Sequence, residues 1–260
     1  MKSNDKFKQA ATLILIRNLG SGIEVYMTER PGTRDFPGLH VFPGGKVDEH
    51  DHQLEHLCER LTDIEASRQL NLEAGGLGYW VTAIRESFEE AGVLLAYSDT
   101  PSRTGEEFPL VATSEDQPEL RIALRDGEIA LGDFLANHAL RLATDRLHYF
   151  SHWITPASAP RRYDARFFVC DMPELQETSP DASEVASAVW ISPAEALSRY
   201  KRKEWAMIDP TLRSLEALAN YDSSAALYRD IQAGTHLQLP TEELRVQGMQ
   251  VIPQFVSKMD

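Results

Sequence analysis

Three glutamates fall within five residues of one predicted helix, and no other feature of the sequence restricts its fold and chemistry as strongly. They are Glu86, Glu89 and Glu90. A helix over about residues 79–91 turns about 100° per residue, which puts the glutamates on one side and an apolar stripe on the other. The stripe consists of Trp80, Ile84, Phe88, Ala91 and Leu95. One side of this helix is therefore expected to be core and the other a carboxylate cluster.

The glutamate spacing suits a divalent cation. Like charges one helical turn apart repel each other, and a bound cation removes that repulsion. Mg²⁺ takes oxygen ligands and commonly lies between one or two carboxylates and substrate phosphates. The alternative is a solvated helix face. Upstream, Gly44 and Gly45 follow a short apolar stretch, where glycine lets the backbone approach a phosphate closely.

Composition limits the other functions that the chain could have. The 260 residues carry a net charge of −14, which repels nucleic acids and anionic membranes at long range. Cys58 and Cys170 are the two cysteines, and they predict neither a disulfide framework nor a zinc site. No signal peptide, membrane-spanning run or C-terminal Ser-Lys-Leu peroxisomal address is recognised, so we expect a cytoplasmic protein.

Strands and helices interleave without strict alternation, which favours a mixed sheet with helices on its faces. Alternating or apolar runs predict strands at 8–17, 23–28, 147–154, 163–170 and 184–191. The first two, separated by a glycine-rich turn, are expected to form a hairpin. Helical periodicity is found at 51–72, 79–91, 131–142, 193–200 and 209–232.

Gly92 is expected to end the second helix, and Ser192 to cap the helix at 193–200. His50, His52 and His56 are interpreted as surface residues rather than a zinc site.

The glutamate segment resembles the Nudix box. The first half of that pattern is a glycine and a glutamate six residues later. Seven further residues separate it from the second half, which begins with Arg-Glu. An aliphatic residue, any residue, Glu-Glu, any residue, Gly and an aliphatic residue then follow. The second half matches at the family spacing, with Ser87 in place of the aliphatic residue. The matching residues are Arg85, Glu86, Glu89, Glu90, Gly92 and Val93.

The first half of the box is interrupted. Gly45 and Arg85 are separated by 39 residues where the family has 13, so about 26 residues, broadly 51–76, are inserted. Counting back from Arg85 reaches Leu77, which gives the first glutamate of the box no aligned match. Asp48, Glu49 and Glu73 are the candidates for its place.

A branch of coenzyme A diphosphatases with a long insertion in the box shows similar segments. They include 42–45, 83–95, 153–156, 160–164 and 190–197, so the resemblance covers roughly residues 8–200. It implies a Nudix-type α/β/α sandwich with a mixed sheet, inserted helices and a C-terminal helical extension. We expect one enlarged domain, with a core at about 8–200, insertions at 51–76 and 99–146, and an extension at 201–260.

The resemblance also implies a mechanism. Glu86, Glu89 and Glu90 would hold one to three Mg²⁺ or Mn²⁺ ions, which neutralise a diphosphate and activate the water that attacks it. Arg85 would orient a glutamate of the box by ion pairing. The general base is left open between Glu86 and a loop residue such as Glu184.

Substrate contacts are expected from the glycine loop and from arginines. Gly44 and Gly45 would approach the diphosphate. Arg161 and Arg162 either bind the extra phosphate of coenzyme A or of a dinucleotide, or anchor strand edges through Asp164. Arg34, together with Arg30, is a further candidate for phosphate contact.

The substrate expected first is coenzyme A or its acyl derivatives, cleaved to 3',5'-ADP and 4'-phosphopantetheine. ADP-ribose or NADH is the alternative, and a nucleotide-binding module without turnover is a second one. We expect no nucleic-acid or membrane partner. The inserted segment is expected either to cap the active site or to form a homodimer interface.

Overall fold

The chain folds around a mixed β-sheet. The computed structural model describes residues 7–20, 22–32, 37–98, 110–111, 117–155 and 162–237. Seven strands form the sheet: β1 (Lys8–Leu19), β2 (Gly22–Glu29), β3 (His40–Val41), β4 (Gly44–Lys46), β7 (His148–Ile154), β8 (Tyr163–Asp171) and β9 (Ser187–Ile191). The order is β3-β2-β1-β8-β7, with β4 joined to β1 and β9 to β2. β1 and β8 run parallel and the other pairs antiparallel, so the predicted mixed sheet is confirmed.

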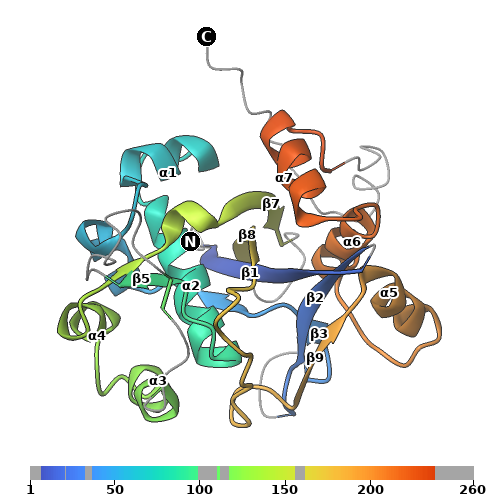
Figure 1. Ribbon diagram of the computed structural model, residues 1–260, viewed down its shortest axis with the longest axis horizontal. Coiled ribbons are helices and arrows are strands. Elements are labelled where there is room, and N and C mark those ends of the chain that lie inside the picture. The colour runs from blue at the N-terminus through green and yellow to red at the C-terminus, as the bar shows by residue number, and fades with distance from the viewer. Residues whose placement is uncertain are drawn as a thin grey trace, which may run out of the picture.

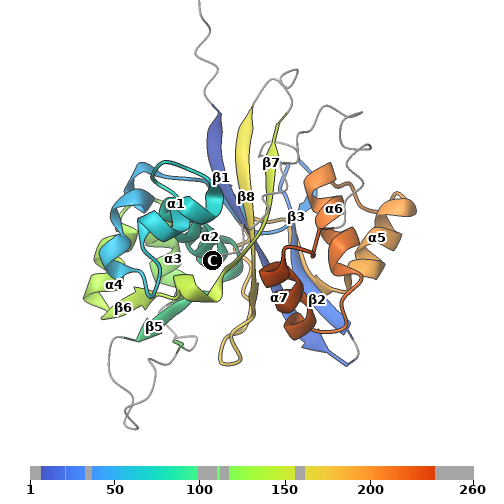
Figure 2. The same cartoon turned by 90° about the horizontal axis from the view of Figure 1, so that it is seen from above.

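Helices cover both faces of the sheet (Figures 1 and 2). One side carries α1 (Asp63–Leu70), α2 (Leu77–Ala91), α3 (Gln117–Arg125) and α4 (Leu131–Asn137). The other carries α5 (Pro193–Lys201), α6 (Asp209–Leu218) and α7 (Ser224–Ala233). This arrangement is the expected α/β/α sandwich.

β1 supplies both hydrophobic cores of the sandwich. Leu13 and Leu15 are buried among the residues that pack against α2. Ile14 and Ile16 are buried on the opposite face, in the core that includes residues of α6 and α7. A strand that is buried on both faces has apolar residues at successive positions. This explains why apolar and polar residues do not alternate clearly in this segment of the sequence.

Several local predictions are confirmed. β1 and β2 form the expected antiparallel hairpin. α2 ends at Gly92, whose φ of 71° is the left-handed conformation that glycine adopts most readily. The Ser192 side chain accepts a hydrogen bond from the backbone N–H of Glu195 and so caps α5.

The single helix predicted for 51–72 is wrong. The segment forms two short 3₁₀ helices, η1 (Glu49–Gln53) and η2 (Glu55–Leu57), before α1. Thr62 caps α1 in a capping box with Glu65, which starts a new helix in the middle of the periodic pattern. Arg60 has a φ of 54° and Cys58 is extended, so the helical path is broken just before that cap.

Two further helix predictions were too long. The helix expected at 131–142 ends at Asn137, and β6 (Leu140–Leu142) pairs with β5 (Ala96–Ser98) in a separate two-stranded sheet. A third 3₁₀ helix, η3 (Thr144–Arg146), then leads into β7. The tail at 209–232 divides into α6 and α7, because Ser223 is extended and caps a new helix.

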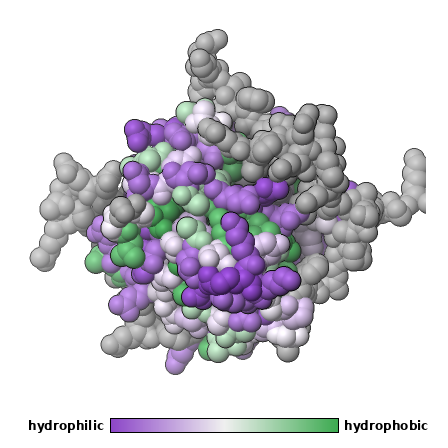
Figure 3. Space-filling model, turned by 90° about the vertical axis from the view of Figure 1, so that its right-hand side faces the viewer, coloured by the Kyte–Doolittle hydropathy of each residue, from purple (hydrophilic) through white to green (hydrophobic). Residues whose placement is uncertain are grey.

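The outer face of α5, α6 and α7 is largely polar. Figure 3 shows hydrophilic residues gathered over it, with only scattered apolar areas. Arg202 illustrates the pattern, since it forms exposed ion pairs with Glu195 and Glu204. Within the described residues, no helix has the length and apolar character needed to cross a membrane.

Candidate active site

α2 is buried on nearly its whole circumference. Of its fifteen residues, only Arg85 and Glu89 are partly exposed. Glu86 and Glu90 are 9% and 5% exposed. The predicted apolar stripe is therefore core, but the carboxylate side is enclosed as well, and the alternative of a solvated face is wrong. Ser87, at the unusual position in the box, is also completely buried.

The glycine loop lies against this helix. The backbone N–H of Gly44 donates to Glu90 Oε2 at 3.2 Å. A Cβ atom at Gly45 would overlap the Glu86 carboxylate, so only glycine lets β4 approach the helix this closely. The long insertion has therefore not displaced the glycine loop from the box helix.

Arg85 holds the glutamates in place. Its Nη1 donates to Glu86 Oε1 at 2.9 Å and to Glu89 Oε2 at 3.2 Å. Its Nη2 also donates to the carbonyl oxygen of Lys46 at 2.9 Å, which ties the box helix to the end of β4. Burial opposes the charged form, but the carboxylates of Glu86, Asp51 and Glu89 raise the pKa of Arg85 above its ordinary value.

Asp51 supplies the acid that the first half of the box lacked. It is 3% exposed, and Arg85 donates to both of its carboxylate oxygens, at 3.2 and 3.1 Å. The hydroxyl of Thr82 donates to the same carboxylate at 2.7 Å. Asp51 lies six residues after Gly45, which is the position of the first acidic residue in the box pattern. Counting forward from Gly45 would have found it, whereas counting back from Arg85 crosses the insertion.

The other candidates for that position do not take it. Glu49 and Glu73 are exposed. Asp48 is exposed too, and its side chain caps η1 by accepting from the backbone N–H of Glu49. The backbone N–H of Asp48 donates to Asp51, so the cap helps to fix the aspartate that pairs with Arg85. The histidines at 50, 52 and 56 are exposed, as expected.

The electrostatics favour an added cation. Burial raises the pKa of Glu89 to about 7. Burial likewise raises the pKa of Glu86, and that of Glu90 well above its ordinary value. Repulsion from Asp51 and Glu184 adds to the shift at Glu86, and Arg85 opposes that shift. Repulsion from Glu86 and Glu184 adds to the shift at Glu90, and Arg30 opposes it. Several buried carboxylates thus have few positively charged partners. Keeping all of them ionised costs free energy unless a cation neutralises them or some of them bind protons.

Glu184 joins this cluster from a different part of the chain. It is 8% exposed, in the loop before β9, and its charge raises the pKa of Glu86, Glu89 and Glu90. The sequence analysis named Glu184 as a candidate for the general base, and that role stays a prediction. Glu184 lies almost a hundred residues after the box glutamates in the sequence, so no local pattern connects it with them.

Two of the predicted arginines, Arg34 and Arg161, lie outside the described residues. The Arg162 guanidinium lies 3.9 Å over the ring of Phe7, and its carbonyl oxygen accepts from the backbone N–H of Lys8. Arg162 is therefore at the start of β1 and β8.

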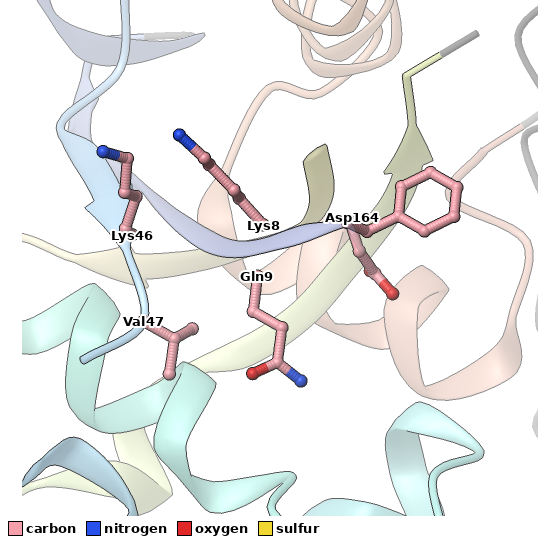
Figure 4. A pocket seen from close by; sticks show the side chains of 6 residues that line it. Lys8, Gln9, Lys46, Val47 and Asp164 are labelled. Atoms are coloured by element: carbon pink, nitrogen blue, oxygen red, sulfur yellow. The ribbon is translucent and has the colours of Figure 1, made fainter. Parts of the chain in front are cut away.

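A pocket of about 550 Å³ opens at this end of the sheet. Its lining residues are Phe7, Lys8, Gln9, Lys46, Val47 and Asp164. Lys8 and Lys46 point to one side of the sheet, and Gln9 and Val47 to the other (Figure 4). Since Lys46 directly follows Gly45, the pocket adjoins the glycine loop.

Asp164 is fixed at the wall of the pocket. His152 Nε2 and Arg166 Nε contact its Oδ1 at 2.8 and 3.1 Å. Burial alone would raise the pKa of Asp164, but these two partners lower it below its ordinary value. The pocket therefore contains an ionised carboxylate besides its two lysines.

The carboxylate cluster is suited to hard divalent ions, since all its donors are carboxylate oxygens. Among the described residues, no three metal-binding side chains form a ready-made cage. Arg85 and the Gly44 N–H bind carboxylate oxygens of Glu86, Glu89 and Glu90. Mg²⁺ is usually bound by one or two carboxylates together with waters and phosphates, so a closed protein cage is not required.

Comparison with known proteins places this chain in a family. The NUDT19 Nudix domain profile matches residues 61–218. Because this match covers more than half of the chain, the protein belongs to the NUDT19 Nudix domain family. The Nudix interpretation of the sequence is thereby confirmed.

Individual proteins agree with this assignment. The human protein named acyl-coenzyme A diphosphatase NUDT19 is 28% identical over 247 residues, covering 80% of this chain. The chicken protein of that name is 28% identical over 244 residues, covering 79%. The chain spans 64% of the length of each of these relatives. A crystal structure of a Nudix hydrolase from Alicyclobacillus acidocaldarius matches with a TM-score of 0.69 and 26% identity, over 88% of this chain and 97% of that one.

Proposed function

We propose that this protein hydrolyses the diphosphate of coenzyme A and acyl-coenzyme A, releasing 3',5'-ADP and 4'-phosphopantetheine or its acyl form. The observation that carries the proposal is the enclosed cluster of Glu86, Glu89 and Glu90. Arg85 binds the first two of these carboxylates, and the backbone N–H of Gly44 in the glycine loop binds the third. The curated relatives named acyl-coenzyme A diphosphatase supply the substrate class.

The cluster would hold Mg²⁺ or Mn²⁺ through Glu86, Glu89 and Glu90, with Glu184 as a further carboxylate close by. When bound, such ions neutralise the diphosphate and make water a stronger nucleophile. The charge distribution supports this, since burial raises the pKa of all three box glutamates. A cation would favour their ionised forms and relieve the repulsion.

The chain's own groups would align the reaction. Gly44 and Gly45 have no side chains that would keep a diphosphate away from the helix. Arg85 and Asp51 fix the directions of the carboxylates. Glu86 or Glu184 would accept the proton of the attacking water, as the oxygen of that water bonds to one phosphorus and the bridging P–O bond breaks.

The pocket beside β4 would receive the part of coenzyme A that carries the 3'-phosphate. Lys8 and Lys46 project on the same side of the sheet, and Arg162 lies at the adjoining strand ends. These three cations outnumber the single ionised carboxylate of Asp164 and so suit a phosphate with two negative charges. The volume of about 550 Å³ lies within the range of about 300–1,000 Å³ for small-molecule sites.

Other parts of the proposal concern the whole molecule. We assign the chain to one enlarged Nudix domain, and we place the protein in the cytoplasm. The insertion expected at about 51–76 would begin after Asp51, because Asp51 takes the acidic position of the box. ADP-ribose or NADH would be the alternative substrate, because either also contains a diphosphate joined to a nucleoside.

The first experiment is a substrate panel with Mg²⁺ or Mn²⁺. Wild type, Glu89→Gln and the exposed control Glu174→Gln would be compared on coenzyme A, acetyl-coenzyme A, ADP-ribose and NADH. We expect coenzyme A or its acetyl ester to be cleaved, with chelator and Glu89→Gln abolishing the cleavage and Glu174→Gln preserving it. Preferred cleavage of ADP-ribose or NADH would replace the substrate, and no cleavage of any compound would favour a binding module.

A further inference from the structure

The C-terminal end of α2 is closed by a loop that precedes β9. The last carbonyl groups of a helix lack partners within it. The backbone N–H of Ser179 donates to the Ala91 carbonyl at 2.8 Å, and that of Asp181 to the Glu90 carbonyl at 3.3 Å. The segment 179–184 is thus attached to the helix turn that carries Glu89 and Glu90.

Arg121 of α3 joins this loop to the same turn. It is 6% exposed. Its Nη1 donates to the carbonyl oxygen of Ser179 at 2.7 Å, and its Nη2 to that of Glu89 at 2.8 Å. The planar guanidinium fork makes one contact with each partner, which a lysine ammonium would not reproduce. Gly92 leaves room for it, because a Cβ there would lie 2.9 Å from Arg121 Nη1.

Arg125 makes a second attachment one helical turn later. Its Nη1 donates to Asp181 Oδ2 at 2.8 Å and to the hydroxyl of Ser183. Asp181 Oδ1 in turn accepts from the backbone N–H and hydroxyl of Ser183, each at 2.8 Å. Residues four apart lie on the same side of a helix, so α3 contacts the loop at two successive points.

Glu184 follows these anchored residues directly. Its backbone N–H donates to the Asp181 carbonyl at 2.9 Å, and its side chain is buried. Two residues later, the backbone N–H of Ala186 donates to the Glu29 carbonyl at 2.8 Å, at the edge of the sheet. The backbone that carries this carboxylate is therefore anchored through the loop to α3 on one side and to β2 on the other.

We propose that Arg121 and Arg125 are positioning residues that hold Glu184 among the box carboxylates for catalysis. This inference rests on the proposed diphosphatase function. A catalytic group on a loop needs surrounding contacts to keep it in its productive position, and a displacement of about 1 Å can cost about 10²-fold in rate. α3, which lies outside the box, would thus determine the geometry of the fourth carboxylate.

A double-mutant cycle tests the inference. Arg121→Met removes both donors while keeping much of the side-chain volume, and Arg213→Met on α6 is the control. We expect Arg121→Met to lower kcat by ~10-fold or more with little change in KM, and Arg213→Met to leave both unchanged.

In a Glu184→Gln background, Arg121→Met should lower kcat by less than about 2-fold, because the carboxylate that Arg121 positions is absent. An equal cost in both backgrounds, or no cost in either, would overturn the proposal, as would full activity of Glu184→Gln.

A second measurement does not depend on turnover. Amide hydrogen exchange at Ser179 and Asp181 should accelerate in Arg121→Met and keep the wild-type rate in Arg213→Met, since these amides bond to α2. Unchanged exchange would refute the positioning role even if the substrate panel showed no activity. Arg125→Met, whose side chain is more exposed, carries the same tests if Arg121→Met fails to fold.

Discussion

Asp51 and Arg85 face each other in a two-point ion pair, with Nε to Oδ1 at 3.2 Å and Nη2 to Oδ2 at 3.1 Å. The pair joins the two halves of an interrupted box across 33 intervening residues. The same guanidinium binds Glu86 and Glu89, so Asp51 contributes to the direction in which these carboxylates point. The insertion therefore folds as a loop that returns to the helix without separating the two halves.

Asp51→Asn should weaken catalysis even though residue 51 acts through Arg85 and not on the substrate. The amide cannot accept both guanidinium donors and would release Arg85 toward the other carboxylates. Loss of such a supporting partner typically costs about 10–100-fold in activity or metal affinity, and we expect kcat/KM to fall in that range. Asp51→Glu, which restores the residue type of the box pattern, should retain more activity than Asp51→Asn. Equal activities of Asp51→Asn and wild type would contradict this role.

Gly45→Ala tests the close approach of β4 to α2. The added Cβ would overlap the Glu86 carboxylate, so either the strand or the carboxylate must move. We expect a loss of about 1–3 kcal/mol in unfolding free energy and a fall in kcat/KM. Gly22→Ala is the control, because its Cβ would meet no atom within 4 Å. Both quantities are measured by denaturant titration and steady-state kinetics, and a Gly45→Ala enzyme as active and stable as Gly22→Ala would disprove the close fit.

Lys46→Gln tests which end of coenzyme A lies in the pocket. Losing one charged contact to a phosphate costs about 1.5–3 kcal/mol, so KM for coenzyme A should rise by roughly 10-fold or more. KM for 3'-dephospho-coenzyme A should not change, because that substrate lacks the phosphate proposed to contact Lys46. Lys201→Gln on the exposed surface of α5 serves as the control. An equal rise for both substrates would place the contact of Lys46 elsewhere on the molecule.

Local sequence patterns predicted the elements whose signals lie within a few residues. The hairpin of β1 and β2, the end of α2 at Gly92 and the cap of α5 at Ser192 depend on propensities of neighbouring residues. The glutamate cluster was recognisable for the same reason, because its spacing is set by one helix.

The supporting contacts could not be predicted in this way. Arg121 bonds to residues 32 and 58 positions away, and Asp51 to a residue 34 positions away. Such pairs depend on how insertions fold back on the sheet, which helical periodicity does not specify. The burial of Glu86 and Glu90 has the same origin, since β4 and the loop at Glu184 enclose a face that the helix alone would leave solvated.

His148 should make stability sensitive to acid. Its ring stacks on Tyr228 with centroids 4.1 Å apart, which joins β7 to α7. Burial lowers the pKa of His148 below its ordinary value of 6.5, with Asp171 opposing the shift and Arg146 adding to it. As the pH falls through 6.5, the unfolded chain therefore binds a proton before the folded protein does, and the stability present above that pH is progressively lost. His148→Phe keeps an aromatic ring against Tyr228 but cannot titrate, so its unfolding free energy should fall less between pH 7 and pH 5 than that of wild type. Denaturant titrations at several pH values measure the two slopes, and identical slopes would show that His148 takes up no additional proton on unfolding.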